Sequence, residues 1–190
     1  MFPVLAALVA MPATLSAQAP AGVEVYQIDS VHSNIGFRVR HLMSKVTGRF
    51  GKVDGTVTLN TKDVTKSSVD VTIAVSSIST NNTQRDGHLL TADFFDAAKY
   101  PNITFKSTAV KEVAKGKLEV TGQFTMHGVT KTITIPVTSL GTSAGMKPGT
   151  FVAGFEGALE IKRSDYGMTT YIPVVGDEVQ ITLNVEADKQ

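Results

Sequence analysis

The segment Lys117-Leu118-Glu119-Val120-Thr121-Gly122-Gln123-Phe124-Thr125-Met126 alternates hydrophobic and hydrophilic residues one by one. Leu118, Val120, Phe124 and Met126 share one parity, which only Gly122 interrupts. Successive side chains of a β-strand point to opposite faces, so this period of two predicts a strand with one buried and one solvated face. The sequence 126–129 that follows it, Met-His-Gly-Val, is typical of a tight turn between antiparallel strands.

The same period recurs from residue 23 onward, in segments rich in Val, Ile, Thr and Phe. Eight segments follow it, and residues 23–28 form a weaker ninth: 35–39, 53–59, 69–75, 103–109, 118–126, 133–137, 151–161 and 179–185. Residues 80–101 break the pattern, and the spacing of Leu89, Leu90, Phe94 and Phe95 suits a short amphipathic helix. Residues 141–150, with three glycines and a proline, predict a flexible loop.

These patterns predict an all-β fold, whose single apolar face can be covered in a sandwich or in a closed barrel. Closed as an antiparallel eight-stranded barrel with a short helical insertion, the sheet leaves room for one slender ligand. Many expected inward residues are small and the chain lacks tryptophan, which favours a long apolar void. The residues expected to line it are Ile35, Phe37, Val39, Val71, Ile73, Val75, Phe105, Phe124, Met126, Phe155, Ile181 and Leu183.

Composition limits the classes of partner. The 190 residues and 42% hydrophobic content fit one domain with one core. Eighteen Lys and Arg residues balance seventeen Asp and Glu residues, so the sequence predicts no binding of nucleic acid and no electrostatic attraction to an anionic membrane. No cysteine is present, which excludes disulfides, thiolate metal sites and cysteine nucleophiles.

The first 21 residues differ from the rest. Phe2 to Ala13 form an uncharged apolar run of about 12 residues, too short for a membrane span, and small residues follow it. We expect a signal peptide over residues 1–21, cleaved after Ala17, Ala21 or between them, and one barrel domain over residues 22–190 without stable membrane insertion.

Catalytic and metal motifs are weak. Residues 141–145, Gly-Thr-Ser-Ala-Gly, match the nucleophile elbow of serine hydrolases, but the sequence after them does not start the helix that this motif requires. Histidines 32, 41, 88 and 127 lack the close pairings of zinc motifs. We therefore predict no catalytic residue, no metal and no cofactor.

Polar residues near the expected loops suggest a mouth that contacts a ligand's head group. Arg85 and His88 begin the helical interruption, and Arg163 and Tyr166 follow a strand. Buried structural pairs are an equally good interpretation of these groups. His41 shares the parity of Ile35, Phe37 and Val39, which places it in the interior near the barrel mouth, either against a head group or bonded to backbone.

Several of these segments together resemble the YceI-like family, bacterial periplasmic proteins that bind polyisoprenoids in a lipocalin-like barrel. The resemblance covers residues 26–187. Its matching segments are 29–33 (Asp-Ser-Val-His-Ser), 37–43, 46–50, 85–89, 94–96, 100–105, 126–131 and 163–167 (Arg-Ser-Asp-Tyr-Gly). It implies a barrel, a periplasmic location and an isoprenoid ligand such as a prenyl diphosphate or a polyprenyl quinone.

The resulting hypothesis is a non-catalytic periplasmic carrier that holds a long isoprenoid in its barrel. One alternative is an enzyme that acts on such a lipid through polar residues at the mouth. Another is a small partner-binding module with an incidental cavity, and a homodimer remains open.

Overall fold

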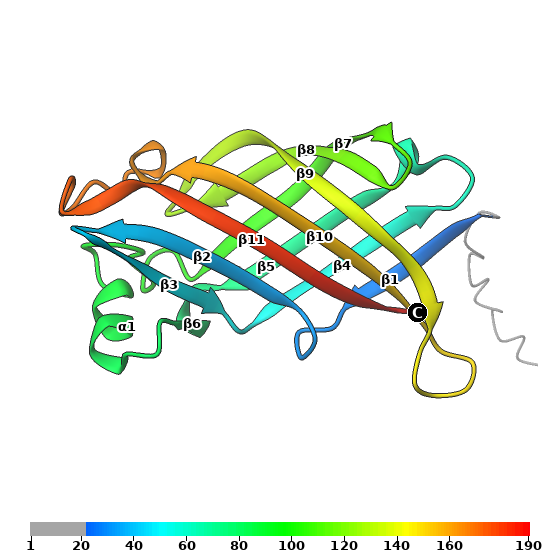
Figure 1. Ribbon diagram of the computed structural model, residues 1–190, viewed down its shortest axis with the longest axis horizontal. Coiled ribbons are helices and arrows are strands. Elements are labelled where there is room, and N and C mark those ends of the chain that lie inside the picture. Colours follow the sequence, from blue (N-terminus) through cyan, green and yellow to red (C-terminus); the bar gives the residue numbers. More distant parts are fainter. Residues whose placement is uncertain (1–21) are drawn as a thin grey trace, which may run out of the picture.

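The computed structural model describes residues 22–190, so the expected signal peptide lies outside the described residues. Most of the described residues form one antiparallel sheet (Figure 1). Its strands are β1 (Val23–Ile28), β2 (Asn34–His41), β3 (Ser44–Phe50), β4 (Val53–Asn60), β5 (Ser68–Ala74), β6 (Ile78–Ser79), β7 (Asn102–Ala114), β8 (Lys117–Met126), β9 (Val129–Ala144), β10 (Phe151–Lys162) and β11 (Val175–Lys189). One α-helix, α1 (Thr83–Leu89), and the 3-10 turns η1 (Val64–Lys66), η2 (Val75–Ser77) and η3 (Arg163–Tyr166) complete it. No helix among the described residues is long and apolar enough to cross a membrane.

Eight of the strands close into a barrel in the order β1-β4-β5-β7-β8-β9-β10-β11, because β11 also pairs with β1. One edge of β11 pairs with β10. Its other edge pairs with two strands: Ala187–Lys189 pair with β1, and residues 175–184 pair with β2. The strands β2, β3 and β6 therefore extend the sheet beyond the ring at one end. The predicted eight-stranded antiparallel barrel is confirmed.

Three local predictions need correction. The sequence does not predict the strand Ser44–Phe50. Only Val46 and Phe50, separated by Gly48, alternate with its polar residues, which is too few apolar residues for a clear period of two. Phe37 fills the space beside Gly48, where an added Cβ would lie 2.3 Å from its ring. The predicted loop 141–150 begins later, since β9 continues to Ala144.

The helical insertion is shorter than its apolar spacing suggested. α1 ends at Leu89, so Phe94 and Phe95 follow it in a series of turns rather than on its face. Asn82 caps the helix by accepting a hydrogen bond from the Arg85 backbone N–H at 2.9 Å. α1 lies at the end of the barrel where β2 and β3 meet, opposite the β9–β10 hairpin (Figure 1).

The turn at 126–129 is confirmed, and its geometry explains its sequence. His127 and Gly128 both have positive φ, 51° and 77°, as a two-residue turn matched to strand twist requires. A Cβ at Gly128 would lie 2.4 Å from the Tyr100 ring, so this turn also needs glycine for close packing.

Candidate functional site

A cavity of about 240 Å³ runs through the interior of the barrel. Residues from nearly every strand line it, from Val39 and Val175 near α1 to Leu59 and Val185 farther along the barrel. All lining residues are hydrophobic except Gly36, Ser67, Ser68, Glu156 and Arg163. Such a surface offers a ligand apolar contact along its length and very few hydrogen-bonding groups.

Strand parity places most of the predicted lining residues in this cavity. Eleven of them line it: Ile35, Phe37, Val39, Val71, Ile73, Phe105, Phe124, Met126, Phe155, Ile181 and Leu183. The exception is Val75, which is buried but does not line the cavity. Val75 starts the 3-10 turn η2, where the chain leaves β5 and strand parity no longer applies.

The end of the cavity next to α1, which we call its mouth, contains residues that strand periodicity does not identify. Leu89, Phe94 and Phe95 from the α1 segment line the cavity, as does Met168 from the β10–β11 connection. The Phe94 ring stacks against Tyr171 at 5.9 Å between centroids, and His88 meets Phe94 edge-on at 5.2 Å. The apolar spacing of residues 89–95 indicated that Phe94 and Phe95 are buried. No pattern in the sequence, however, predicts that Phe94 contacts Tyr171.

Arg163 is 4% exposed and lies at this end of the cavity, with its guanidinium carbon 6.0 Å from the Phe94 ring centre. Its Nε donates to the Gly176 carbonyl, Nη1 to the Met168 carbonyl, and Nη2 to the carbonyls of Thr170 and Val175, all within 2.7–2.9 Å. Burial lowers the pKa of Arg163, and the charge of Asp177 opposes part of that effect. The side chain stays cationic and holds the 168–176 backbone in place.

Arg85 is likewise engaged with backbone. Its Nε donates to Thr80 Oγ1 at 2.7 Å and its Nη2 to the Thr80 carbonyl at 2.9 Å. Asp86 accepts from the Thr80 backbone N–H at 2.8 Å, so both charges hold the start of α1 rather than each other. Arg85 does not line the main cavity.

His88 is exposed, and its Nε2 lies 2.8 Å from Asp93 Oδ2. Together with Phe94 and Tyr171 it forms the rim of the mouth. Tyr166 is 1% exposed and packs edge-on against Phe124 at 5.4 Å, behind the cavity wall. Burial raises the pKa of Tyr166, and Asp165 adds to this. Arg163 and His88 therefore meet at Phe94, whereas Arg85 and Tyr166 lie apart from them.

The placement of His41 in the interior is wrong. His41 pairs with Ser44 and Val175 at the end of β2, beyond the last lining residue of that strand, Val39. It is exposed and does not line the cavity. Strand parity correctly assigns His41 to the same face of β2 as Val39. β2, however, extends beyond the end of the cavity, so the His41 side chain is exposed.

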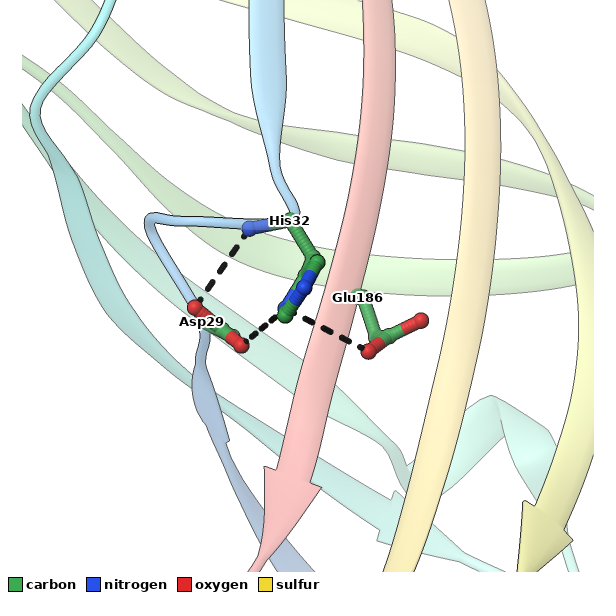
Figure 2. Close-up of side chains that lie close together, drawn as sticks. All are labelled: Asp29, His32 and Glu186. Carbon is green, nitrogen blue, oxygen red and sulfur yellow. Dashed lines mark hydrogen bonds and ion pairs between the residues drawn. The ribbon is translucent and has the colours of Figure 1, made fainter. Parts of the chain in front are cut away.

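Away from the mouth, Asp29, His32 and Glu186 lie close together between β1, β2 and β11 (Figure 2). His32 Nδ1 lies 2.6 Å from Asp29 Oδ2 and 3.9 Å from Glu186 Oε1. The hydrogen bond raises the pKa of His32 and lowers that of Asp29. Asp29 Oδ1 also accepts from the Val31 backbone N–H at 2.7 Å, which stabilises the turn from β1 into β2. This geometry is explained by the turn, so the cluster is better read as structural than as a metal centre.

Neither the histidines of residues 22–190 nor the elbow-like sequence at 141–145 has the partners of a serine-hydrolase site. Among residues 22–190, no histidine ring is hydrogen-bonded to a serine or threonine hydroxyl: His32 and His88 contact carboxylates, and His127 contacts the Tyr166 carbonyl. Residues 141–144 belong to β9, so Ser143 lies in a strand rather than at a strand-to-helix turn.

Known proteins share this architecture. The model of the YceI-like domain family matches residues 26–187. Protein YceI of Escherichia coli is 40% identical over 169 residues, which cover 87% of each chain. The crystal structure of BcnA from Burkholderia cenocepacia aligns with a TM-score of 0.74 and 29% identity, over 84% of this chain and 99% of BcnA.

A more distant structure, a polyisoprenoid binding domain from Saccharophagus degradans, aligns with a TM-score of 0.67 and 18% identity, over 87% of this chain and 98% of that domain. At this identity the likeness concerns the fold alone. The family model and the Escherichia coli relative, by contrast, match the sequence across the barrel. This chain belongs to the YceI-like family.

Proposed function

We propose that this protein is a periplasmic carrier that holds one long isoprenoid lipid in the barrel. The observation that carries this proposal is the lining of the cavity, which is hydrophobic at all but five positions. The Saccharophagus degradans domain, which has the same fold, is described as polyisoprenoid binding. The periplasmic location rests on the apolar run at residues 2–13 and on the family resemblance.

Burial of the isoprenoid chain in the cavity supplies the binding affinity. At about 25 cal/mol per Å² of apolar surface, each buried isoprene unit contributes on the order of 2 kcal/mol before the entropy cost of binding. Several units in series bind tightly without hydrogen bonds. Selectivity then depends on the length and width of the bore, which exclude bulky or polar ligands.

The contacts at the mouth favour a neutral head group. A guanidinium has five N–H donors, and Arg163 already uses four of them on backbone carbonyls. Arg85 is committed to Thr80. Arg163 therefore cannot clamp a diphosphate in the bidentate manner that such recognition uses, and Arg85 does not line the cavity. A polyprenyl quinone, whose head needs few partners, fits the site better than a prenyl diphosphate.

The first test is to identify what the purified protein holds. Native mass spectrometry with lipid extraction should find a polyisoprenoid at about one molecule per chain, chemically unchanged. Delipidated protein should then rebind a long polyprenyl quinone more tightly than a prenyl diphosphate of equal chain length. Purified protein that repeatedly holds no lipid, and does not bind either probe, would overturn the carrier function. A recovered lipid that the protein converts to another product would favour the enzyme instead.

A further inference from the structure

Five large hydrophobic side chains are exposed at the end of the barrel that holds the mouth. Leu42 and Met43, 60% and 96% exposed, form the turn between β2 and β3. Tyr171, Ile172 and Val174 lie in the connection between β10 and β11 and are 39–49% exposed. We call these five residues the tip patch. The Leu42 backbone N–H donates to the Val174 carbonyl at 3.0 Å, so its two segments lie side by side.

The tip patch is held in its exposed position. Residues 167–174 contain no charged residue. Their backbone is held in place by buried Arg163, which donates hydrogen bonds to the carbonyls of Met168 and Thr170. The Tyr171 ring stacks on Phe94, a cavity-lining residue. The exposed apolar surface is therefore continuous with the lining of the bore, and it does not fold away into the core. Exposed apolar clusters of this kind mark binding surfaces.

Positive charge accompanies the tip patch. Arg38, Arg40, Lys45 and Arg49 are exposed on the outward face of the β2–β3 hairpin, and neither strand carries a carboxylate. Within residues 22–190 none of the four forms an ion pair. Of the outward carboxylates of the adjacent strand β11, Glu178 is opposite Lys162 in the sheet, whereas Glu186 and Asp188 lie beyond the part of β11 that pairs with β2.

This distribution corrects what composition suggested. A net charge of +1 predicts no attraction to an anionic membrane. The fold, however, gathers four cations on one hairpin beside an uncharged apolar surface. Clusters of basic residues next to apolar side chains are the pattern by which proteins bind the surface of anionic bilayers.

We propose that the tip patch and the four hairpin cations dock this protein onto a bilayer that contains anionic phospholipids, with the mouth of the bore toward the membrane. The proposal rests on the proposed function, since a carrier of a membrane lipid must exchange its cargo with a bilayer. In the docked state Leu42 and Met43 enter the acyl region and the cations contact phosphates. The cargo then passes along Tyr171 and Phe94 into the bore without crossing water.

The absence of tryptophan from the chain allows a direct test. Met43→Trp introduces a single fluorescent reporter at the tip patch. Met146→Trp introduces the same reporter in the β9–β10 connection at the opposite end of the barrel, where Met146 is also fully exposed. Vesicles of phosphatidylglycerol and phosphatidylethanolamine should shift the Met43→Trp emission to shorter wavelength, and brominated acyl chains should quench it. Met146→Trp should not respond, and phosphatidylcholine vesicles should produce a much smaller shift.

Sedimentation with the same vesicles measures the affinity. Near an anionic surface each basic residue is worth about fivefold in affinity, so Arg40→Gln with Lys45→Gln should weaken binding on the order of twentyfold. Leu42→Ser with Met43→Ser should weaken it about tenfold or more. Met146→Ser, the matched control, should bind as the wild type does. About 1 M salt should reduce wild-type binding, because screening acts over roughly 3 Å there.

Lipid content is measured on the same samples, which separates this proposal from the carrier function. Wild-type protein that carries lipid but does not bind these vesicles overturns docking and leaves the carrier function intact. Vesicle binding by protein that never holds lipid supports docking and overturns the carrier function. An equal response of Met146→Trp overturns the assigned surface. A dimer that Met43→Ser abolishes, without vesicle binding by the wild type, shows that a second copy covers the patch and overturns membrane docking.

Discussion

At the scale of single residues, Arg163 has an unusual set of hydrogen-bond partners. It is a buried cation whose partners are four backbone carbonyls, and among the described residues no carboxylate lies within ion-pair distance of it. Those carbonyls belong to residues 168–176, which border the mouth and carry part of the tip patch. One side chain therefore determines the shape of the entrance.

We expect Arg163→Met to lower the free energy of unfolding by about 2–4 kcal/mol, because several charge-assisted hydrogen bonds are lost and their carbonyls are left without partners. Arg163→Lys should lose a similar amount, since an ammonium group cannot reach four carbonyls in this fork geometry. Urea denaturation measures both. Lys162→Met, at an exposed neighbour, should change stability by less than about 0.5 kcal/mol. A fully stable Arg163→Lys would show that charge, and not the geometry of the fork, is what matters.

His32 gives the stability a pH dependence. Its folded-state pKa is raised, chiefly by the hydrogen bond to Asp29. Its contribution is therefore fully present below the unfolded pKa near 6.5 and is lost as the pH rises through the higher folded value. The difference in Tm between wild type and His32→Gln should be largest near pH 5.5 and should shrink toward about pH 8.5. A difference for His32→Gln that stays constant over this range would contradict the assignment.

At the scale of secondary-structure elements, strand parity determines what can enter the bore. On β5, Val71 and Ile73 line the cavity and Thr72 between them points outward. On β10, Phe155 and Leu159 line it, but Ala153, of the same parity, is fully buried in the wall beside Ala187 and does not. A bulky residue at 153 would therefore overpack the wall instead of filling the bore.

Val71→Phe places the added ring in the cavity and should displace about one isoprene unit of ligand. The expected loss is on the order of thirtyfold in affinity for a long polyprenyl quinone. Thr72→Phe increases side-chain volume even more, but on the outer face of the barrel, so this variant should bind the quinone as the wild type does. Titration of delipidated protein with the quinone measures both. Equal affinities for Val71→Phe and wild type would show that the ligand does not occupy this part of the bore.

At the scale of the whole molecule, the sequence predicts the barrel well because its dominant signal is local. Alternation over five or more residues identifies most strands, and parity then identifies the lining at residues such as Phe124 and Ile181. β3 is missed because only Val46 and Phe50 carry its apolar alternation. The rim of the mouth is missed for a different reason: the contacts of Phe94 with Tyr171 and Arg163 join residues about 70 positions apart, outside regular strands.

The same limit applies to charge. Arg38, Arg40, Lys45 and Arg49 look unremarkable in a chain of balanced composition, and only the hairpin pairing of β2 with β3 places them on one face. Net charge is a property of the sequence, but a charged surface is a property of the fold.

The pairing of β1 with β11 joins residues 26–28 to residues 187–189, and Glu24 also contacts Lys189. Because these are nearly the first and last residues of the barrel, the ring cannot close on a growing chain. Until residues 187–189 are available, β1 has its partner β4 on one edge only, and the barrel is open between β1 and β11. Ring closure therefore depends on contacts between residues far apart in the sequence, and such long-range contacts make folding slow. A chain that ends before residue 187 can form part of the sheet, but it cannot close the barrel around a ligand.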